Sequence, residues 1–381
     1  NQLPPIGYGR PFHDLVAYVK NDKSRRESHL VRLEVNCRQR FDKKILRVAE
    51  VFVVRNRYYE EILEEIAKGG QLSPWLVVEY WTTREQLGCL IDRYVQQVVA
   101  KTCGSSILNK EEGLNRLFGL HPQGYVPNGL VENVEVDNLQ MLTPYRAGFH
   151  GTIGLNDFVR TEYKKTWWPD QQYPRSVFGH SDKLIRIENW YGWDRVQRRR
   201  VLRLCNGSVG IVCNKKEGRR LYFPDAPYPI SWELDEEEHF ELAYAVTVHK
   251  AQGSEFANVL VVVPERRSLL SRELVYTALT RSTGPLVLFI QRTARENPLE
   301  VARNRSAVLP RNTSLFSKPE EAQRILQPDP GVLVKSMIEY TIYRALKEER
   351  TKGRLGFLYE NPLELVIDGR KVVIKPDFTI E

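Results

Sequence analysis

The chain has 381 residues, of which 42% are hydrophobic and 27% are charged, and its formal net charge is +8. These values are ordinary for a globular protein of two or three domains. No apolar run approaches the length of a membrane span, and the first residues, NQLPPIGYGRPF, lack the pattern of a signal peptide. The scattered cysteines include no CxxC pair, which argues against metal or disulfide sites and predicts a cytoplasmic protein: Cys37, Cys89, Cys103, Cys205 and Cys213.

The first half of the chain predicts alternating helices and strands. A helical pattern extends from Lys43 to Lys68, and an amphipathic helix is expected through Leu87 and Val98. Strands are expected at Trp75–Tyr80 and Leu139–Leu142. This order of elements indicates an α/β domain.

From Val177 to about Glu238 the pattern changes to short strands separated by turns, which predicts a small all-β insert: Lys183–Ile187, Val209–Cys213 and Arg220–Phe223. Positive charge is concentrated here, since Ser181–Arg220 holds eleven Lys or Arg and four Asp or Glu residues. Such a patch suits a polyanion, although a solvated surface explains the charge equally well. Three aromatic residues near the basic run could stack on bases or belong to the core: Trp190, Tyr191 and Trp193. Leu234–His239 is interpreted as a solvated acidic connector.

The most informative stretch is Glu241–Arg281, ELAYAVTVHKAQGSEFANVLVVVPERRSLLSRELVYTALTR. A short apolar run, Leu242–Val246, leads into a polar loop, and Val259–Val263 has the composition of a strand buried on both faces. A helical stripe over Glu273–Thr280 ends at Arg281, whose guanidinium could reach a phosphate.

This stretch resembles motifs V and VI of superfamily 1 DNA helicases, closest to the RecD-like branch, in which TVHKxQGSEF and YTAxTR are signatures. The resemblance implies a RecA-like motor domain, a parallel sheet with flanking helices, that uses ATP with Mg²⁺ as cofactor. It implies that Arg281 is an arginine finger and that Gly253 and Glu255 contact ATP. It also implies a grip on single-stranded DNA or DNA junctions by three residues: Thr247, His249 and Lys250.

Four further parts of the chain resemble parts of the same family. NQLPPIG is similar to the second half of motif III, which makes Gln2 a phosphate sensor, and LEVNCRQR is similar to motif IV, which gives Arg38 a phosphate role. TPYRAGFHGTIGLN resembles a DNA-binding stretch in which Thr143 holds a phosphate with Arg146 nearby. A threonine that stabilises the turn at Pro144 is the alternative interpretation. The insert resembles the small Src-homology-like barrel of RecD-like helicases.

The C-terminal part predicts a separate unit. After a proline-rich segment from Thr293 to Pro330, a helix is expected at Lys335–Glu349, and a hairpin is expected from Leu363–Ile367 and Lys371–Ile374. This order resembles the start of a PD-(D/E)xK nuclease-like domain, in which Glu339 and Asp377 would bind Mg²⁺. The second half of that motif does not follow before Glu381, so an incomplete nuclease site is expected.

A motor ATPase needs GxxxxGK[ST], and the sequence contains no Gly-Lys dipeptide. The family order places that loop and the main Mg²⁺ ligands before Asn1. We therefore expect the C-terminal part of a helicase that works with an N-terminal motor domain of the same protein and does not hydrolyse ATP alone. No membrane partner is expected. The alternatives are a non-catalytic nucleic-acid-binding module and a DNA-loading platform for a C-terminal nuclease.

The expected domains follow from these motifs. They are the end of a first RecA-like domain (1–28), a second RecA-like domain (29–178 and 239–300), the β-barrel insert (179–238), a linker (301–330) and the incomplete nuclease-like α+β domain (331–381).

Overall fold

The computed structural model describes residues 3, 11–21, 30–31, 42–53, 59–104, 107, 109–164, 176–194, 198–215, 218–232, 234–265, 268–292, 297–307, 337–353, 357–359, 363–367, 370–374 and 378–380. The chain divides into two compact units. One comprises Asn1–Leu3 and Val35–Ala307, and the other comprises Pro4–Glu34 and Val308–Glu381.

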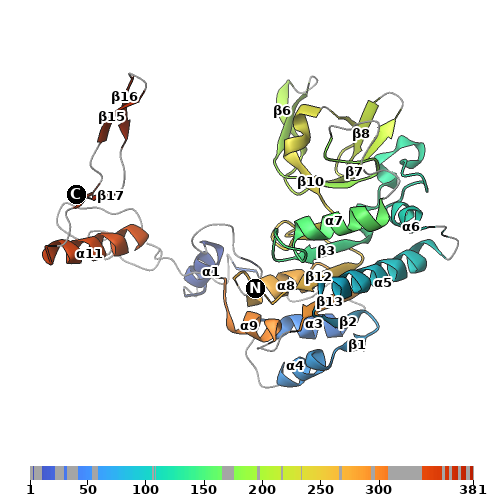
Figure 1. Ribbon diagram of the computed structural model, residues 1–381, viewed down its shortest axis with the longest axis horizontal. Coiled ribbons are helices and arrows are strands. Elements are labelled where there is room, and N and C mark those ends of the chain that lie inside the picture. The colour runs from blue at the N-terminus through green and yellow to red at the C-terminus, as the bar shows by residue number, and fades with distance from the viewer. Residues whose placement is uncertain are drawn as a thin grey trace. The chain divides into compact units, whose positions relative to one another are not determined.

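A six-stranded sheet in the order β1-β2-β13-β12-β3-β11 forms the centre of the larger unit (Figure 1). All its neighbouring strands are parallel except β1 and β2. The strands are β1 (Gly70–Ser73), β2 (Leu76–Trp81), β3 (Gln140–Thr143), β11 (Ala245–Thr247), β12 (Val259–Val263) and β13 (Leu286–Gln291). The strands predicted near residues 75, 139 and 259 are confirmed, and the mixed, mainly parallel sheet is typical of a RecA-like domain.

Helices cover both faces of this sheet. They are α3 (Lys43–Glu50), α4 (Tyr59–Lys68), α5 (Arg84–Cys103), α6 (Lys110–Leu117), α7 (Thr152–Tyr163), α8 (Arg272–Leu279) and α9 (Pro298–Asn304), with short 3-10 helices η1 (Pro127–Gly129), η2 (Val131–Asn133), η3 (Val136–Asn138) and η4 (Leu234–His239). The helical pattern over residues 43–68 is not one helix, because the backbone turns after Glu50 and Val53 N–H donates to the Glu50 carbonyl at 2.9 Å.

Alternate residues of the central strands enter two separate cores. Val259, Val261 and Val263 face α3, α4, α8 and α9, whereas Leu260 and Val262 face α5, α6 and α7. Both faces of β12 are therefore buried, which explains its unbroken run of leucine and valine.

The insert contains a five-stranded antiparallel sheet in the order β10-β4-β7-β8-β9 and a separate hairpin of β5 and β6. Its strands are β4 (Lys183–Arg186), β5 (Trp190–Asp194), β6 (Arg199–Leu204), β7 (Val209–Lys215), β8 (Gly218–Tyr222), β9 (Ile230–Ser231) and β10 (Phe240–Leu242). An antiparallel insert is confirmed, whereas its closure into a barrel and the domain boundaries remain predictions.

The apolar run Leu242–Val246 belongs to two sheets and is not one continuous strand. β10 ends at Leu242 in the insert sheet, and β11 begins at Ala245 in the six-stranded sheet. The Gln140 side-chain amide donates to the carbonyls of Ala243 and Tyr244 at 3.0 and 3.1 Å. Side-chain hydrogen bonds thus satisfy the backbone where the chain passes between the sheets.

The described part of the smaller unit contains α1 (Pro11–Asn21), α11 (Met337–Thr351), β14 (Phe357–Tyr359), β15 (Leu363–Ile367), β16 (Arg370–Ile374) and β17 (Phe378–Ile380). β15 pairs antiparallel with β16, and Ile367 is the register partner of Arg370, which confirms the predicted hairpin. β14 pairs antiparallel with β17. The predicted helix over residues 335–349 is confirmed as α11, two residues further along at each end.

Candidate functional site

Thr143 and Thr247 lie at the carboxyl ends of neighbouring parallel strands, β3 and β11, where they are register partners. Val248 N–H donates to the Thr143 carbonyl at 3.1 Å and joins the two strand ends. Because open α/β sheets bind ligands beyond the carboxyl ends of their strands, this edge is a suitable place for a site. The fold therefore brings together two segments that are far apart in the sequence.

The two threonine hydroxyls differ in their accessibility. The Thr143 side chain is fully buried, and its hydroxyl donates to the His150 carbonyl at 2.8 Å. The turn-stabilising alternative therefore describes this hydroxyl in the structure. Thr247 is only partly buried, and its hydroxyl accepts from Lys250 N–H at 3.3 Å. Thr247 is consequently the more accessible of the two.

A carboxylate links the two cations that the sequence placed near DNA. Glu241 Oε1 lies 3.0 Å from Arg146 Nη2, and Glu241 Oε2 lies 2.7 Å from Lys250 Nζ. The Arg146 side chain is 62% exposed, whereas Lys250 and Glu241 are 26% and 30% exposed. Two cations therefore converge on one anion at a solvent-accessible position, an arrangement in which a phosphate oxygen can take the place of the carboxylate.

Two neighbouring cavities open beside this cluster. The smaller, of about 40 Å³, is lined by Arg146, Thr247 and Lys250 among others. The larger, of about 230 Å³, lies between the start of α7 and β10, and Arg146 and Glu241 also line it. Three of the five predicted DNA-contacting residues thus share one hollow.

His249, in the loop that follows β11, is half-buried. Burial lowers the pKa of its imidazole below the usual value of 6.5. His249 is therefore mainly neutral at pH 7 and can contribute hydrogen bonds there rather than a full positive charge.

Arg281 is almost fully buried, with an exposed fraction of 1%. Its Nε donates to the Thr277 carbonyl at 3.1 Å, and its Nη1 donates to the Ser254 carbonyl at 3.0 Å. A third bond, of 3.2 Å, joins Nη2 to the Thr280 hydroxyl. The guanidinium is therefore held by the end of α8 and by the loop that follows β11.

The same loop and helix hold Leu3. Leu3 N–H donates to the Thr277 hydroxyl at 3.0 Å, and the Gln252 side-chain amide donates to the Leu3 carbonyl at 3.2 Å. With the bonds of Arg281 to Thr277 and Ser254, these contacts close a ring that includes Leu3. Gln252 and Thr277 were not among the predicted site residues, because their partners lie more than two hundred positions away.

The structure describes only some of the other residues that were predicted to contact ATP or its phosphates. Gly253 has φ of +90°, a conformation that favours glycine, and no atom lies within 4 Å of the position that a Cβ would take. Glu255, two residues further along the chain, is exposed. Gln2 and Arg38 lie outside the described residues.

The two candidate Mg²⁺ ligands of the nuclease-like part lie beyond what the structure describes. Glu339 belongs to α11, but its side chain is outside the described set, and Asp377 is outside it altogether. Within the described residues, no three His, Cys, Asp or Glu side chains are grouped so that they could hold a metal ion.

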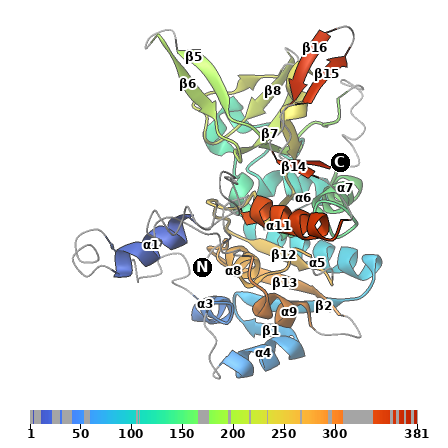
Figure 2. The same ribbon diagram turned by 90° about the vertical axis from the view of Figure 1, so that its left-hand side faces the viewer.

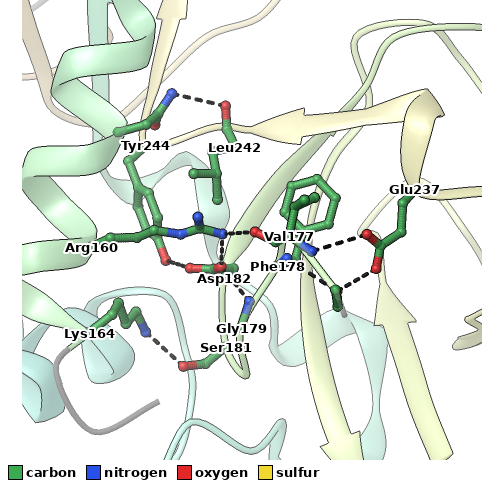
Figure 3. A network of polar contacts seen from close by, with 12 residues as sticks. Arg160, Lys164, Val177, Phe178, Gly179, Ser181, Asp182, Glu237, Leu242 and Tyr244 are labelled. Carbon is green, nitrogen blue, oxygen red and sulfur yellow. Dashed lines mark hydrogen bonds and ion pairs between the residues drawn. The ribbon is translucent and has the colours of Figure 1, made fainter. Parts of the chain in front are cut away.

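A buried polar network joins α7 to the insert (Figure 3). Asp182 accepts from Arg160 at 2.7 Å and from the Tyr244 hydroxyl at 2.9 Å, and it also accepts from Gly179 N–H at 2.7 Å. Glu237 in η4 accepts from Val177 N–H at 3.1 Å, so the acidic segment is not simply a solvated connector. The network fixes the insert on the six-stranded sheet.

Two buried lysines lie beside this network. Lys164 donates to Ser181 and Asn115 at 2.7 and 2.6 Å, and burial lowers its pKa to about 8. Lys183 donates to the Val136 carbonyl at 2.7 Å, and burial lowers its pKa to about 7 against the opposing effect of Asp137. These cations serve the junction and are not exposed to a ligand.

Part of the sequence is similar to helicases. The sequence model of the UvrD-like helicase C-terminal domain matches residues 242–289. This match begins at the last residue of β10 and covers β11, β12, α8 and most of β13. Among the residues that the structure describes, no helix is long and apolar enough to span a membrane.

Two relatives illustrate the similarity. The uncharacterized protein MJ1519 of Methanocaldococcus jannaschii is 26% identical over 411 residues, which cover 100% of this chain and 33% of that protein. The ATP-dependent RecD2 DNA helicase of Deinococcus radiodurans is 33% identical over 184 residues, which cover 47% of this chain and 23% of that protein. The chain thus spans a third or less of the length of these relatives.

A crystal structure of Pif1 helicase from Bacteroides in complex with ADP-AlF3 and ssDNA is 13% identical, with a TM-score of 0.32. The matched region covers 85% of this chain and 65% of that one. By sequence, residues 242–289 thus match the UvrD-like helicase C-terminal domain, and about half of the chain is similar to a RecD-like DNA helicase.

Proposed function

We propose that this chain is part of an ATP-dependent DNA helicase and that the carboxyl edge of its six-stranded sheet contacts single-stranded DNA. The observation that carries the proposal is the convergence of Arg146 and Lys250 on Glu241, beside the accessible Thr247 hydroxyl. A DNA phosphate would displace the carboxylate from the two cations. Such contacts hold the backbone of a strand without reading its sequence.

In the proposed ATP site, Arg281 is the arginine finger, and the loop of Gly253 and Glu255 lies beside the nucleotide. Arg281 would have to exchange bonds to the Thr277 and Ser254 carbonyls for bonds to a phosphate, which are stronger because the acceptor is charged. This exchange would also alter the hydrogen-bond ring through Leu3, because Thr277 is bonded to both Arg281 and Leu3.

The phosphate loop and the main Mg²⁺ ligands would come from residues outside this sequence, since it contains no Gly-Lys dipeptide. The isolated chain should therefore show no DNA-stimulated ATP hydrolysis, and sustained turnover would overturn this part of the proposal. In a protein that also carries the loop, Arg281→Ala should reduce ATP hydrolysis by about a thousandfold.

The DNA contact can be tested by fluorescence anisotropy with a labelled oligothymidylate. Lys250→Ala should weaken binding and reduce the slope of log affinity against log salt by about 0.7, since one phosphate contact is lost. Glu241→Gln should have the opposite effect on affinity, because it removes the anion that competes with the phosphate.

The matched control is Lys101→Ala, in the last turn of α5, which removes a lysine outside the cluster and should leave the affinity unchanged. Unchanged binding by both Lys250→Ala and Glu241→Gln would refute the sheet-edge contact.

A further inference from the structure

The β5–β6 hairpin projects from the five-stranded sheet of the insert and forms a two-stranded sheet of its own (Figure 2). At its base, Trp190 packs against the apolar core of the insert. Beyond Trp190, most described side chains of the hairpin are exposed. The hairpin is therefore anchored at one end and accessible along its length.

One face of the hairpin carries exposed aromatic groups. Tyr191 and Trp193 are two residues apart on β5 and thus point to the same side, and they are 48% and 60% exposed. Their register partners are Leu202, which is 45% exposed, and Arg200. Residues with this separation lie about 6.6 Å apart, close to the rise of two stacked bases.

The same hairpin is strongly basic. Trp190–Leu204 contains five arginines and one acidic residue, Asp194. Arg203 Nη2 donates to the Trp193 carbonyl at 3.3 Å, and its side chain crosses the position where a Cβ would stand at Gly192. Glycine at position 192 thus makes room for a guanidinium directly behind the aromatic pair.

We infer that this hairpin is a second contact for single-stranded nucleic acid, distinct from the sheet edge. Tyr191 and Trp193 stack on bases, and Arg200 and Arg203 attract the backbone phosphates. Exposed rings flanked by permanently charged guanidinium groups match a strand whose bases are unpaired, and a duplex keeps its base faces covered. The inference rests on the proposed nucleic-acid function and assigns it an additional surface.

The test uses the complete 381-residue chain and a fluorescein-labelled oligothymidylate of about 20 nucleotides, longer than the site of one small binding fold. Trp193→Ala should weaken binding by about 5- to 150-fold, the range that loss of one stacked base produces. Trp193→Phe, which keeps a ring, should restore most of the affinity. A duplex of equal length should bind the wild type and Trp193→Ala alike.

The matched control is Tyr228→Ala, which removes an aromatic residue that is 76% exposed on the same insert but outside the hairpin. Circular dichroism verifies that each variant is folded. If Lys250→Ala weakens binding but Trp193→Ala does not, the hairpin inference is wrong and the sheet-edge contact stands. If Trp193→Ala weakens binding while Lys250→Ala and Glu241→Gln both leave it unchanged, the hairpin inference is supported and the sheet-edge contact is refuted. No binding by the wild type would refute both. An equal loss for the duplex would refute base stacking.

Discussion

Arginine and tyrosine occur both at the junction between the six-stranded sheet and the insert and on the β5–β6 hairpin, but in opposite surroundings. At the junction, Arg160 and Tyr244 are buried and share Asp182 as their acceptor. On the hairpin, Arg200 and Tyr191 are exposed. In these two regions, burial and hydrogen-bond partners, rather than residue type, separate the groups that hold the fold from the groups that are accessible to a ligand.

The largest effect of a substitution on stability is expected at the junction between the six-stranded sheet and the insert. Asp182→Ala would leave the Arg160 guanidinium buried without its carboxylate, and it would remove the acceptor of the Tyr244 hydroxyl. We expect the free energy of unfolding to fall by about 3–5 kcal/mol. Urea denaturation measures this change. Asp182→Asn keeps one carbonyl oxygen as an acceptor and should lose less. A loss below about 1 kcal/mol for Asp182→Ala would contradict the structural role of the network.

An intermediate, pH-dependent effect is expected from Lys183, whose pKa is about 7 in the folded chain against an ordinary value of 10.5. Between pH 7 and 10.5, Lys183 is protonated in the unfolded chain but largely neutral in the folded chain. Unfolding therefore takes up a proton, and the contribution of Lys183 to stability increases as the pH rises. The wild type should therefore gain stability relative to Lys183→Met between pH 7 and 9, by at most about 1.4 kcal/mol per pH unit. Urea titrations at several pH values measure the difference, and a gap that stays constant with pH would exclude this titration.

The smallest effect on stability is expected on the hairpin. Arg200→Ala removes an exposed side chain, so the free energy of unfolding should change by no more than about 0.5 kcal/mol. The same variant should weaken binding to single-stranded DNA more at low salt than at high salt. A large loss of stability would show that Arg200 holds the fold, as the buried Arg160 does.

Local sequence patterns predicted several elements correctly. The valine and leucine run became β12, the stripe before Arg281 became α8, and the turn between two apolar runs became the β15–β16 hairpin. These elements depend on neighbours in the chain. The division of residues 242–246 between two sheets could not be predicted in the same way, because Gln140 and Asn156 supply the hydrogen bonds from a distance.

The candidate site, too, could be predicted only in part from the sequence. The sequence indicated Arg146, Thr247 and Lys250 as DNA contacts, and the fold brings these three residues around one hollow. It did not indicate Glu241 as the common partner of the two cations, because that pairing depends on the meeting of β10 with the turn that follows β3. It also left two interpretations open for the Thr143 hydroxyl, which the structure shows bonded to the His150 carbonyl.

The residue types at the site, the strong basic character of residues 181–220 and the resemblance to the RecD-like branch of superfamily 1 helicases are all evident from the sequence. The burial of Arg281 in a hydrogen-bond ring became evident from the three-dimensional structure, as did the exposure of Tyr191 and Trp193 and the packing of Trp190 on the insert core. The physical reason is that burial and long-range hydrogen bonds depend on which distant segments meet, and a local pattern does not contain that information.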